Sequence, residues 1–222
     1  MTTHMQKEIE KLKKKVITMG SVVEDMVYLA TKSILTKDAR MAQQIINRDV
    51  EVGQMEVDIE EECLKILALH QPVAIDLRFI VAVLKINSDL ERVGDLAVNI
   101  AERSLYLSNV NYVCIPYDYT RMAHKVEDML SRSIEALVTM DAKAAYIIRT
   151  EDEEIDAMNR EIYECMKIEI PKHPDQVSCL LHALSVGRHL ERIADHATNI
   201  AEDVVYLVDA VIIRHSPEVF QD

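Results

Sequence analysis

Two stretches of the chain decide its fold: residues 84–107 (LKINSDLERVGDLAVNIAERSLYL) and residues 184–207 (LSVGRHLERIADHATNIAEDVVYL). When the second stretch is shifted back by 100 residues, twelve of the 24 positions are identical. The repeated residues include the polar Glu91, Arg92 and Asp95 as well as apolar positions. Helix-bundle patterning alone repeats apolar positions and does not reproduce charged residues in register. We therefore infer an internal duplication.

The rest of the chain has the composition and periodicity of long helices. Only 4 Gly and 5 Pro interrupt 222 residues, whereas strand-rich folds need many more turn residues. In residues 5–36 the apolar side chains recur every three or four positions, which is typical of a helix with one buried face. Further helices are expected at residues 38–70 (with Asp38 as N-cap), 73–108, 119–139, 141–170 and 176–214.

Three long helices joined by short connections pack side by side in antiparallel fashion. We therefore predict an all-α protein of two tandem antiparallel three-helix bundles with spectrin-like packing. The first bundle is expected at residues 1–110 and the second at residues 119–222. Residues 111–118 are expected to be the linker, because this region is β-branched, contains Pro and lacks helical periodicity.

Composition also limits the classes of function. A net charge of −13 disfavours nucleic-acid binding, because phosphate contacts need a basic surface. The dense basic cluster consists of Lys11, Lys13, Lys14 and Lys15. It is interpreted as a solvated helix face, with docking to an acidic partner as the alternative. The four cysteines form no CxxC pair, which favours reduced thiols over disulfides or a zinc knuckle.

The sequence shows no sign of membrane insertion or export. No stretch reaches the roughly 18 apolar residues of a membrane-spanning helix. The N-terminal residues MTTHMQKEIEKLKKK contain no apolar signal core. We therefore expect a cytoplasmic protein without a membrane segment.

Each copy of the repeat carries a stripe of oxygen-bearing side chains. The first stripe consists of Glu91, Asp95, Asn99 and Glu102, and the second of Glu191, Asp195, Asn199 and Glu202. Because an α-helix turns about 100° per residue, the members of each stripe fall within roughly 80° of one another. Asp152 and Asp156 lie four residues apart on the preceding helix of the second half. Asp49 opens the equivalent stretch of the first half, but the position four residues later is Gly53.

These acids are candidate metal ligands. Two acids one helical turn apart repel each other unless a cation or a proton lies between them. Hard cations prefer such all-oxygen sites. The alternative is that the acids are solvated or pair with Arg92, Arg192 and Lys85. The duplication of the set in register favours a metal role for Glu91, Asp95, Glu191, Asp195, Asp152, Asp156 and Asp49.

Histidine ligands are not expected at this site. His182, His189 and His196 are spaced by seven residues, and their stripe is centred more than about 100° from the carboxylates. We expect these histidines at a helix interface or on a solvent-exposed face. The sequence has no Glu-x-x-His pair, no Walker loop, and no GxGxxG, GxSxG or HExxH motif. A helical bundle of this kind is typical of a regulator or adaptor.

Three motifs carry a family resemblance that covers nearly the whole chain. HQPVAIDLR (70–78), LERVGDLAVNIAE (90–102) and LERIADHATNIAE (190–202) resemble the PhoU family, bacterial regulators of phosphate signalling. The resemblance implies a negative regulator of the phosphate-starvation response. It further implies an adaptor between the ATPase subunit of the high-affinity phosphate importer and its sensor histidine kinase. We also expect a homodimer.

The resemblance also bears on the metal. Some PhoU-like proteins hold multinuclear iron or other metal clusters through E(D)xxxD motifs. Carried over residue by residue, these motifs are Glu91/Asp95, Glu191/Asp195, Asp152/Asp156 and the incomplete Asp49…Gly53. Glu151 remains an alternative to Asp152, because the register of that helix is uncertain by one residue. The identity of the metal stays open among iron, manganese, zinc and magnesium.

The alternative class of function is a metal-dependent helical enzyme that acts on phosphate compounds. Bound cations would then polarise phosphate or generate hydroxide. The sequence contains no recognisable nucleophile–base pair, Lys/Arg phosphate clamp or Gly-rich loop. We therefore expect a protein that is not an enzyme.

Overall fold

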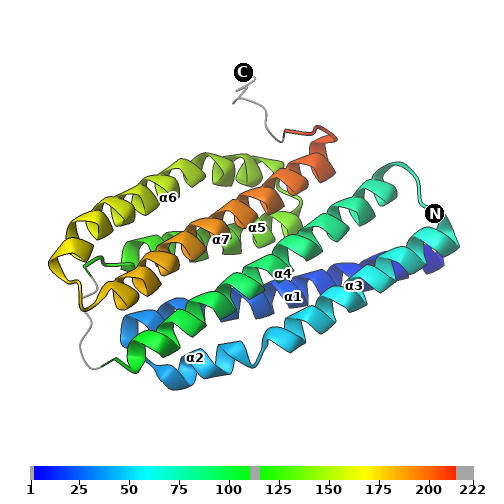
Figure 1. Ribbon diagram of the computed structural model, residues 1–222. Coiled ribbons are helices and arrows are strands. Elements are labelled where there is room, and N and C mark those ends of the chain that lie inside the picture. Colours follow the sequence, from blue (N-terminus) through cyan, green and yellow to red (C-terminus); the bar gives the residue numbers. More distant parts are fainter. Residues whose placement is uncertain (1–2, 111–115, 214–222) are drawn as a thin grey trace.

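The computed structural model describes residues 3–110 and 116–213, and within these ranges all regular structure is helical (Figure 1). The first half holds α1 (Thr3–Thr36), α2 (Ala39–Ile46), α3 (Asp49–His70) and α4 (Ala74–Ser108). The second half holds α5 (Thr120–Thr139), α6 (Ala142–Glu169), the 3₁₀ helix η1 (Ile170–Lys172) and α7 (Val177–Asp209). The predicted all-α class is confirmed.

The two halves meet along α4 and α7, the helices that carry the repeated motif. In Figure 1, α7 and α4 lie side by side, with α6 beyond α7 and α3 beyond α4. A second contact joins α1 to α5. The α4–α7 contact, called the seam below, is antiparallel. Lys85, near the start of α4, pairs with Asp203 near the end of α7, and Tyr106 near the end of α4 bonds Ser178 at the start of α7.

One apolar core runs through both halves. It is aliphatic and rich in methionine, and its largest fully buried side chains include Leu12, Met19 and Met26 of α1 and Met122 and Met129 of α5. Burial of such side chains is the main favourable contribution to folding. The division into bundles at residues 1–110 and 119–222 stays a prediction, and part of the expected linker, residues 111–115, lies outside the described residues.

The prediction of a single helix over residues 38–70 was wrong. The chain forms two helices there, α2 and α3, with a turn at Asn47 and Arg48. There the hydrogen-bond pattern tightens: the Arg48 N–H donates to the carbonyl of Ile45, three residues back rather than four. Ile45 is fully buried, and Val52 beyond the turn is 2% exposed. The turn therefore allows both α2 and α3 to pack their apolar side against the core.

Helix ends follow local chemistry. Asp38 is the N-cap of α2 as predicted, and its carboxylate accepts hydrogen bonds from the N–H groups of Arg40 and Met41. Asp141 caps α6 in the same way. The last helix is shorter than predicted: α7 ends at Asp209, because Ala210 adopts a left-handed φ of 61°. No helix within residues 3–110 and 116–213 is long and apolar enough to cross a membrane.

Candidate functional site

In the second half, α6 and α7 bring four of the predicted acids together. Asp152 and Asp156 come from α6, and Glu191 and Asp195 come from α7. The carboxylate of Asp152 accepts a 3.5 Å hydrogen bond from the Thr198 hydroxyl, which fixes it against α7. We call these four acids the C-terminal cluster.

The pKa shifts in the C-terminal cluster show electrostatic repulsion between its members. Burial, followed by the charges of Asp195 and Asp156, raises the pKa of Asp152 to about 6. The pKa of Glu191 is also raised by burial and then by the three other acids of the cluster. Burial and the charge of Asp156 raise the pKa of Asp195. Neighbouring like charges disfavour ionisation, so a bound proton or cation would stabilise this cluster.

The two adjacent acids of α6 have different neighbours. Glu151 pairs with Arg132 of α5. Asp152 is the one that interacts with Asp195 and Thr198 of α7. Glu202, the last acid of the second stripe, is 3.1 Å from Arg149 of α6 and forms an ion pair there.

In the first half, α3 and α4 form a corresponding N-terminal cluster. Burial raises the pKa of Glu91, and the charges of Asp95, Glu56 and Asp49 raise it further. Arg92 partly offsets this effect, because its guanidinium lies 3.6 Å from the carboxylate of Glu91. Two other predicted ligands, Asp49 and Asp95, therefore lie within electrostatic reach of Glu91.

Glu56 is the member of this cluster that the sequence analysis missed. It lies seven residues after Asp49, which is two helical turns and the same helix face. That spacing is the signal that could have identified Glu56, but the predicted motif contains only acids that are four residues apart. Through Glu56, the N-terminal cluster gains a fourth carboxylate in a different position from that of Asp156.

The close approach of α3 to α4 depends on Gly94. A Cβ placed on Gly94 would lie 3.2 Å from Cγ1 of Val52, tighter than ordinary van der Waals contact. Asp49 precedes Val52 by three residues and Glu56 follows it by four, so both lie on the side of α3 that flanks this contact. The small residue inside the motif thus allows tight packing of α3 on α4.

Burial fixes the register between the two middle helices. With a shift of 103 residues, three buried positions of α3 (Val52, Ile59 and Cys63) match three buried positions of α6 (Ile155, Ile162 and Met166). This shift places Asp49 on Asp152 and Gly53 on Asp156. The incomplete motif of the first half is therefore a real difference between the two halves.

The clusters have the chemistry of a hard-cation site without being assembled as one. Across residues 3–110 and 116–213, no group of three or more His, Cys, Asp or Glu side chains is arranged to hold a metal ion. Mutually repelling carboxylates are expected to turn apart in the absence of a cation. All donors in both clusters are carboxylate oxygens, which fits Mg²⁺, Mn²⁺ or iron. Neither cluster includes a histidine.

The three histidines of α7 lie along the seam. His182 stacks on Tyr106 with ring centroids 3.9 Å apart, and Nδ1 of His196 lies 2.8 Å from a carboxylate oxygen of Asp89. Both ring nitrogens of His189 are buried and have no hydrogen-bond partner among the residues that the structure describes, and burial lowers the pKa of His189 to about 4. Of the two expected locations, the helix interface is the one observed.

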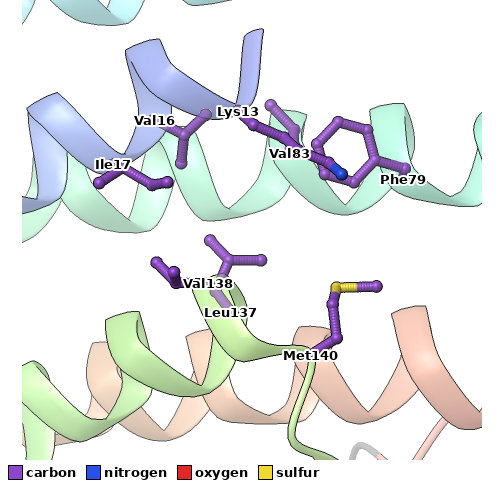
Figure 2. A pocket seen from close by; sticks show the side chains of 8 residues that line it. All are labelled: Lys13, Val16, Ile17, Phe79, Val83, Leu137, Val138 and Met140. Atoms are coloured by element: carbon purple, nitrogen blue, oxygen red, sulfur yellow. The ribbon is translucent and has the colours of Figure 1, made fainter. Parts of the chain in front are cut away.

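A cavity between the halves carries no comparable chemistry. It has a volume of about 50 Å³ and lies where the start of α1 and α4 faces the end of α5 (Figure 2). Figure 2 shows it lined by Lys13, Val16, Ile17, Phe79, Val83, Leu137, Val138 and Met140. Lys13 is the one polar residue of this lining, and its ammonium lies 5.5 Å from the centre of the Phe79 ring.

Comparison with known proteins finds the same domain in both halves of the chain. The model of the PhoU domain matches residues 16–104 and again residues 119–204. The phosphate-specific transport system accessory protein PhoU homolog of Pseudomonas aeruginosa is 35% identical over 211 residues, covering 94% of this chain and 86% of that protein. The Aquifex aeolicus protein of the same name is 34% identical over 209 residues, covering 94% and 95% of the two chains.

Two solved structures agree with the fold. The crystal structure of PhoU from Pseudomonas aeruginosa superposes with a TM-score of 0.89 at 33% identity, covering 93% of this chain and 99% of that one. The phosphate transport system regulatory protein PhoU from Streptococcus pneumoniae superposes with a TM-score of 0.82 at 30% identity, covering 94% and 98%. The similarity therefore extends over the full arrangement of helices.

Proposed function

The chain belongs to the PhoU family, and from that membership we propose that it is a negative regulator of the phosphate-starvation response. In this role it is an adaptor between the high-affinity phosphate importer and the importer's sensor histidine kinase, and it modulates phosphate uptake. The observation that carries the proposal is the double match of the PhoU domain, one match in each half. The names of the relatives, accessory protein and regulatory protein, support it.

The family membership confirms the expectation that the chain is not an enzyme, since its relatives are named accessory proteins. The alternative of a metal-dependent phosphate enzyme has no specific observation in its favour. The cytoplasm is the proposed location, because both proposed partners, an ATPase subunit and a histidine kinase, present their catalytic parts there.

We further propose that the two clusters bind divalent cations. Asp152, Asp156, Glu191 and Asp195 would hold the ion in the second half, and Asp49, Glu56, Glu91 and Asp95 in the first. Burial and then the neighbouring carboxylates raise the pKa values of Asp152, Glu191 and Glu91. These shifts support the proposal, because a bound cation stabilises the charged carboxylates against both effects. A bound cation would neutralise the carboxylates and tie α6 to α7, and α3 to α4. It would therefore stabilise the packing of each of these helix pairs.

Deletion of the gene tests the regulatory role. In a strain without another PhoU-like gene, the deletion should make phosphate-starvation promoters active in phosphate-rich medium. A truncation before Leu184, which removes most of α7, should have the same effect because it removes half of the seam. Normal repression in the deletion strain would refute the proposal.

A further inference from the structure

The turn between α3 and α4 exposes an unusual amount of apolar surface. Its four exposed aliphatic side chains are Leu69 (65% exposed), Val73 (72%), Ile75 (54%) and Leu77 (40%). Pro72 between them is buried, and Gln71 and Ala74 adopt left-handed φ angles of 45° and 50°. Such angles are costly for residues other than glycine and mark a turn whose shape is imposed by its surroundings. This turn lies within the motif HQPVAIDLR that the sequence analysis singled out.

The corresponding turn of the second half provides an internal comparison. Between α6 and α7 the chain forms η1 and exposes charged residues instead, among them Lys172 and Asp175. Lys172 pairs with Glu169 at 2.8 Å. Two large aliphatic side chains that flank this turn are exposed, Ile168 (58%) and Leu181 (49%). The turn of the second half is therefore less apolar than that of the first half, where four such side chains are exposed.

A row of lysines lies at the same end of the molecule. Lys7, Lys11 and Lys14 are exposed on one face of α1 and line a shallow depression together with Gln6 and Glu10. Within the described part of the chain, Lys7 and Lys14 have no ion pair, and Lys11 is 3.7 Å from Glu62. This basic row stands out in a chain whose net charge is −13.

Other residues of α1 contact the helices on either side of the turn. Glu8, next to Lys7, lies 2.6 Å from Nε2 of His70 at the end of α3. Lys13 lies over the ring of Phe79 near the start of α4. Figure 1 shows the start of α1, the end of α3 and the start of α4 at one end of the molecule. We call Leu69, Val73, Ile75, Leu77, Lys7, Lys11 and Lys14 together the end face.

We propose that the end face is a docking surface for an acidic amphipathic helix of a partner protein, an inference that rests on the adaptor role proposed above. An apolar turn beside a lysine row is complementary to a helix with one aliphatic and one acidic side. The apolar contacts supply affinity, and the free lysines steer the acidic partner toward the surface. At the equivalent turn of the second half, Ile168 and Leu181 are exposed, but the nearby Lys167 and Lys172 are paired with Glu164 and Glu169.

Two other occupants fit less well. A second copy of the chain would bring the same lysines to the contact, and like charges facing each other disfavour such a pairing. A uniformly anionic lipid surface would attract the lysines but repel Asp76 in the turn and Glu10 in the row. A helix with its own charge pattern can avoid these acids, and this favours a protein partner.

The test measures binding of the purified chain to two purified probes from the same organism, the importer's ATPase subunit and the cytoplasmic part of the kinase. Two double variants probe the end face: Lys7→Glu with Lys14→Glu, and Val73→Ser with Ile75→Ser. Their matched controls lie in the second half: Lys143→Glu with Lys167→Glu, and Ile168→Ser with Leu181→Ser. All of these side chains are exposed, and thermal melts by circular dichroism verify that each variant is folded.

At least one probe should bind the wild type, about tenfold more tightly than it binds either end-face variant and within about twofold of its affinity for the controls. Binding that is equal for end-face variants and controls overturns the docking surface and leaves the adaptor role standing. If neither probe binds the wild type, the adaptor role and the docking surface both fail. The surface is also overturned if its variants lose only self-association, or only sedimentation with phosphatidylglycerol-containing vesicles.

Discussion

Nδ1 of His196 donates a 2.8 Å hydrogen bond to a carboxylate oxygen of Asp89, joining α7 to α4 across the seam. The same oxygen lies 3.4 Å from the side-chain nitrogen of Asn199. One acid of the first half thus serves two donors of the second. Position 189, the counterpart of Asp89 in the repeat, is a histidine, and its ring has no hydrogen-bond partner within residues 3–110 and 116–213. The duplicated helices have therefore diverged where they face each other.

Replacement of Asp89 should destabilise the whole molecule. Asp89→Ala leaves two partly buried donors without their acceptor, which should cost about 1–3 kcal/mol of the free energy of unfolding. Urea denaturation measures this cost. Ser88→Ala, on the exposed neighbour, is the control and should change stability by less than about 0.5 kcal/mol. Equal unfolding midpoints for both variants would show that the bond contributes nothing.

The pKa of Asp152 predicts a pH dependence for the metal-free protein. Folding raises this pKa from 3.8 to about 6, so the folded state favours the protonated carboxyl. The resulting stability is present below about pH 4 and is lost as the pH rises through about 6. In chelator, Asp152→Asn should therefore be more stable than wild type at pH 7.5, by on the order of 1 kcal/mol because solvent screens this partly exposed carboxyl, and lose that advantage near pH 4. Identical pH profiles in urea denaturation would contradict the repulsion within the cluster.

Gly53→Asp should strengthen metal binding by the N-terminal cluster. A Cβ at Gly53 meets no atom within 4 Å, so the new side chain has room. The register places the new carboxylate on the position of Asp156 in the second half. The Mn²⁺-induced rise in melting temperature should be larger in this variant than in wild type. Gly53→Asn is the matched control, because it has the same size and a similar helix propensity without the charge. The same rise in both variants would rule out a ligand at this position.

Glu56→Gln tests the carboxylate that the sequence analysis missed. In an Asp195→Asn background, which weakens the C-terminal cluster, this change should reduce the remaining Mn²⁺-induced stabilisation. Glu60→Gln, an exposed change on the same helix, should leave it intact. Thermal melts with chelator and with Mn²⁺ measure both effects. If Glu56→Gln behaves like Glu60→Gln, the N-terminal cluster consists of Asp49, Glu91 and Asp95 alone.

The two intact clusters should differ in affinity. We expect the C-terminal cluster to bind more tightly, since it has two complete motifs on facing helices. Asp195→Asn should therefore lower the metal-induced rise in melting temperature more than Asp95→Asn does. Titrations with Mn²⁺, Fe²⁺, Zn²⁺ and Mg²⁺ measure these shifts. Equal melting of wild type and both variants with and without every metal would reduce the stripes to solvated acidic surfaces.

The helix class and the equivalence of the two halves could be predicted because they follow from patterns visible in the sequence. The in-register repeat of Glu91 and Asp95 identified α4 and α7 as equivalent, and apolar spacing identified α1. The turn at Asn47 could not be predicted in this way. Both sides of it are helical, and only the position of Ile45 and Val52 against the core determines that the hydrogen-bond pattern tightens between them.

Three-dimensional packing also decided the membership of the clusters. The spacing of Asp152 and Asp156 was sufficient to identify them, because both lie on one i,i+4 ridge. Glu56 required knowledge of which face of α3 meets α4, and Gly94 and Val52 set that face. The distinction between Glu151 and Asp152 depended on Arg132 of a different helix. Contacts between helices thus supplied what periodicity within one helix could not.

The adaptor role is tested most directly by co-purification from phosphate-replete cells. The chain, tagged and expressed at its natural level, is isolated under mild conditions, and the bound proteins are identified by mass spectrometry. We predict that the ATPase subunit of the phosphate importer and the sensor histidine kinase are recovered together with it, and that an unrelated tagged protein recovers neither. Recovery of the intact chain without either protein would contradict the proposed function.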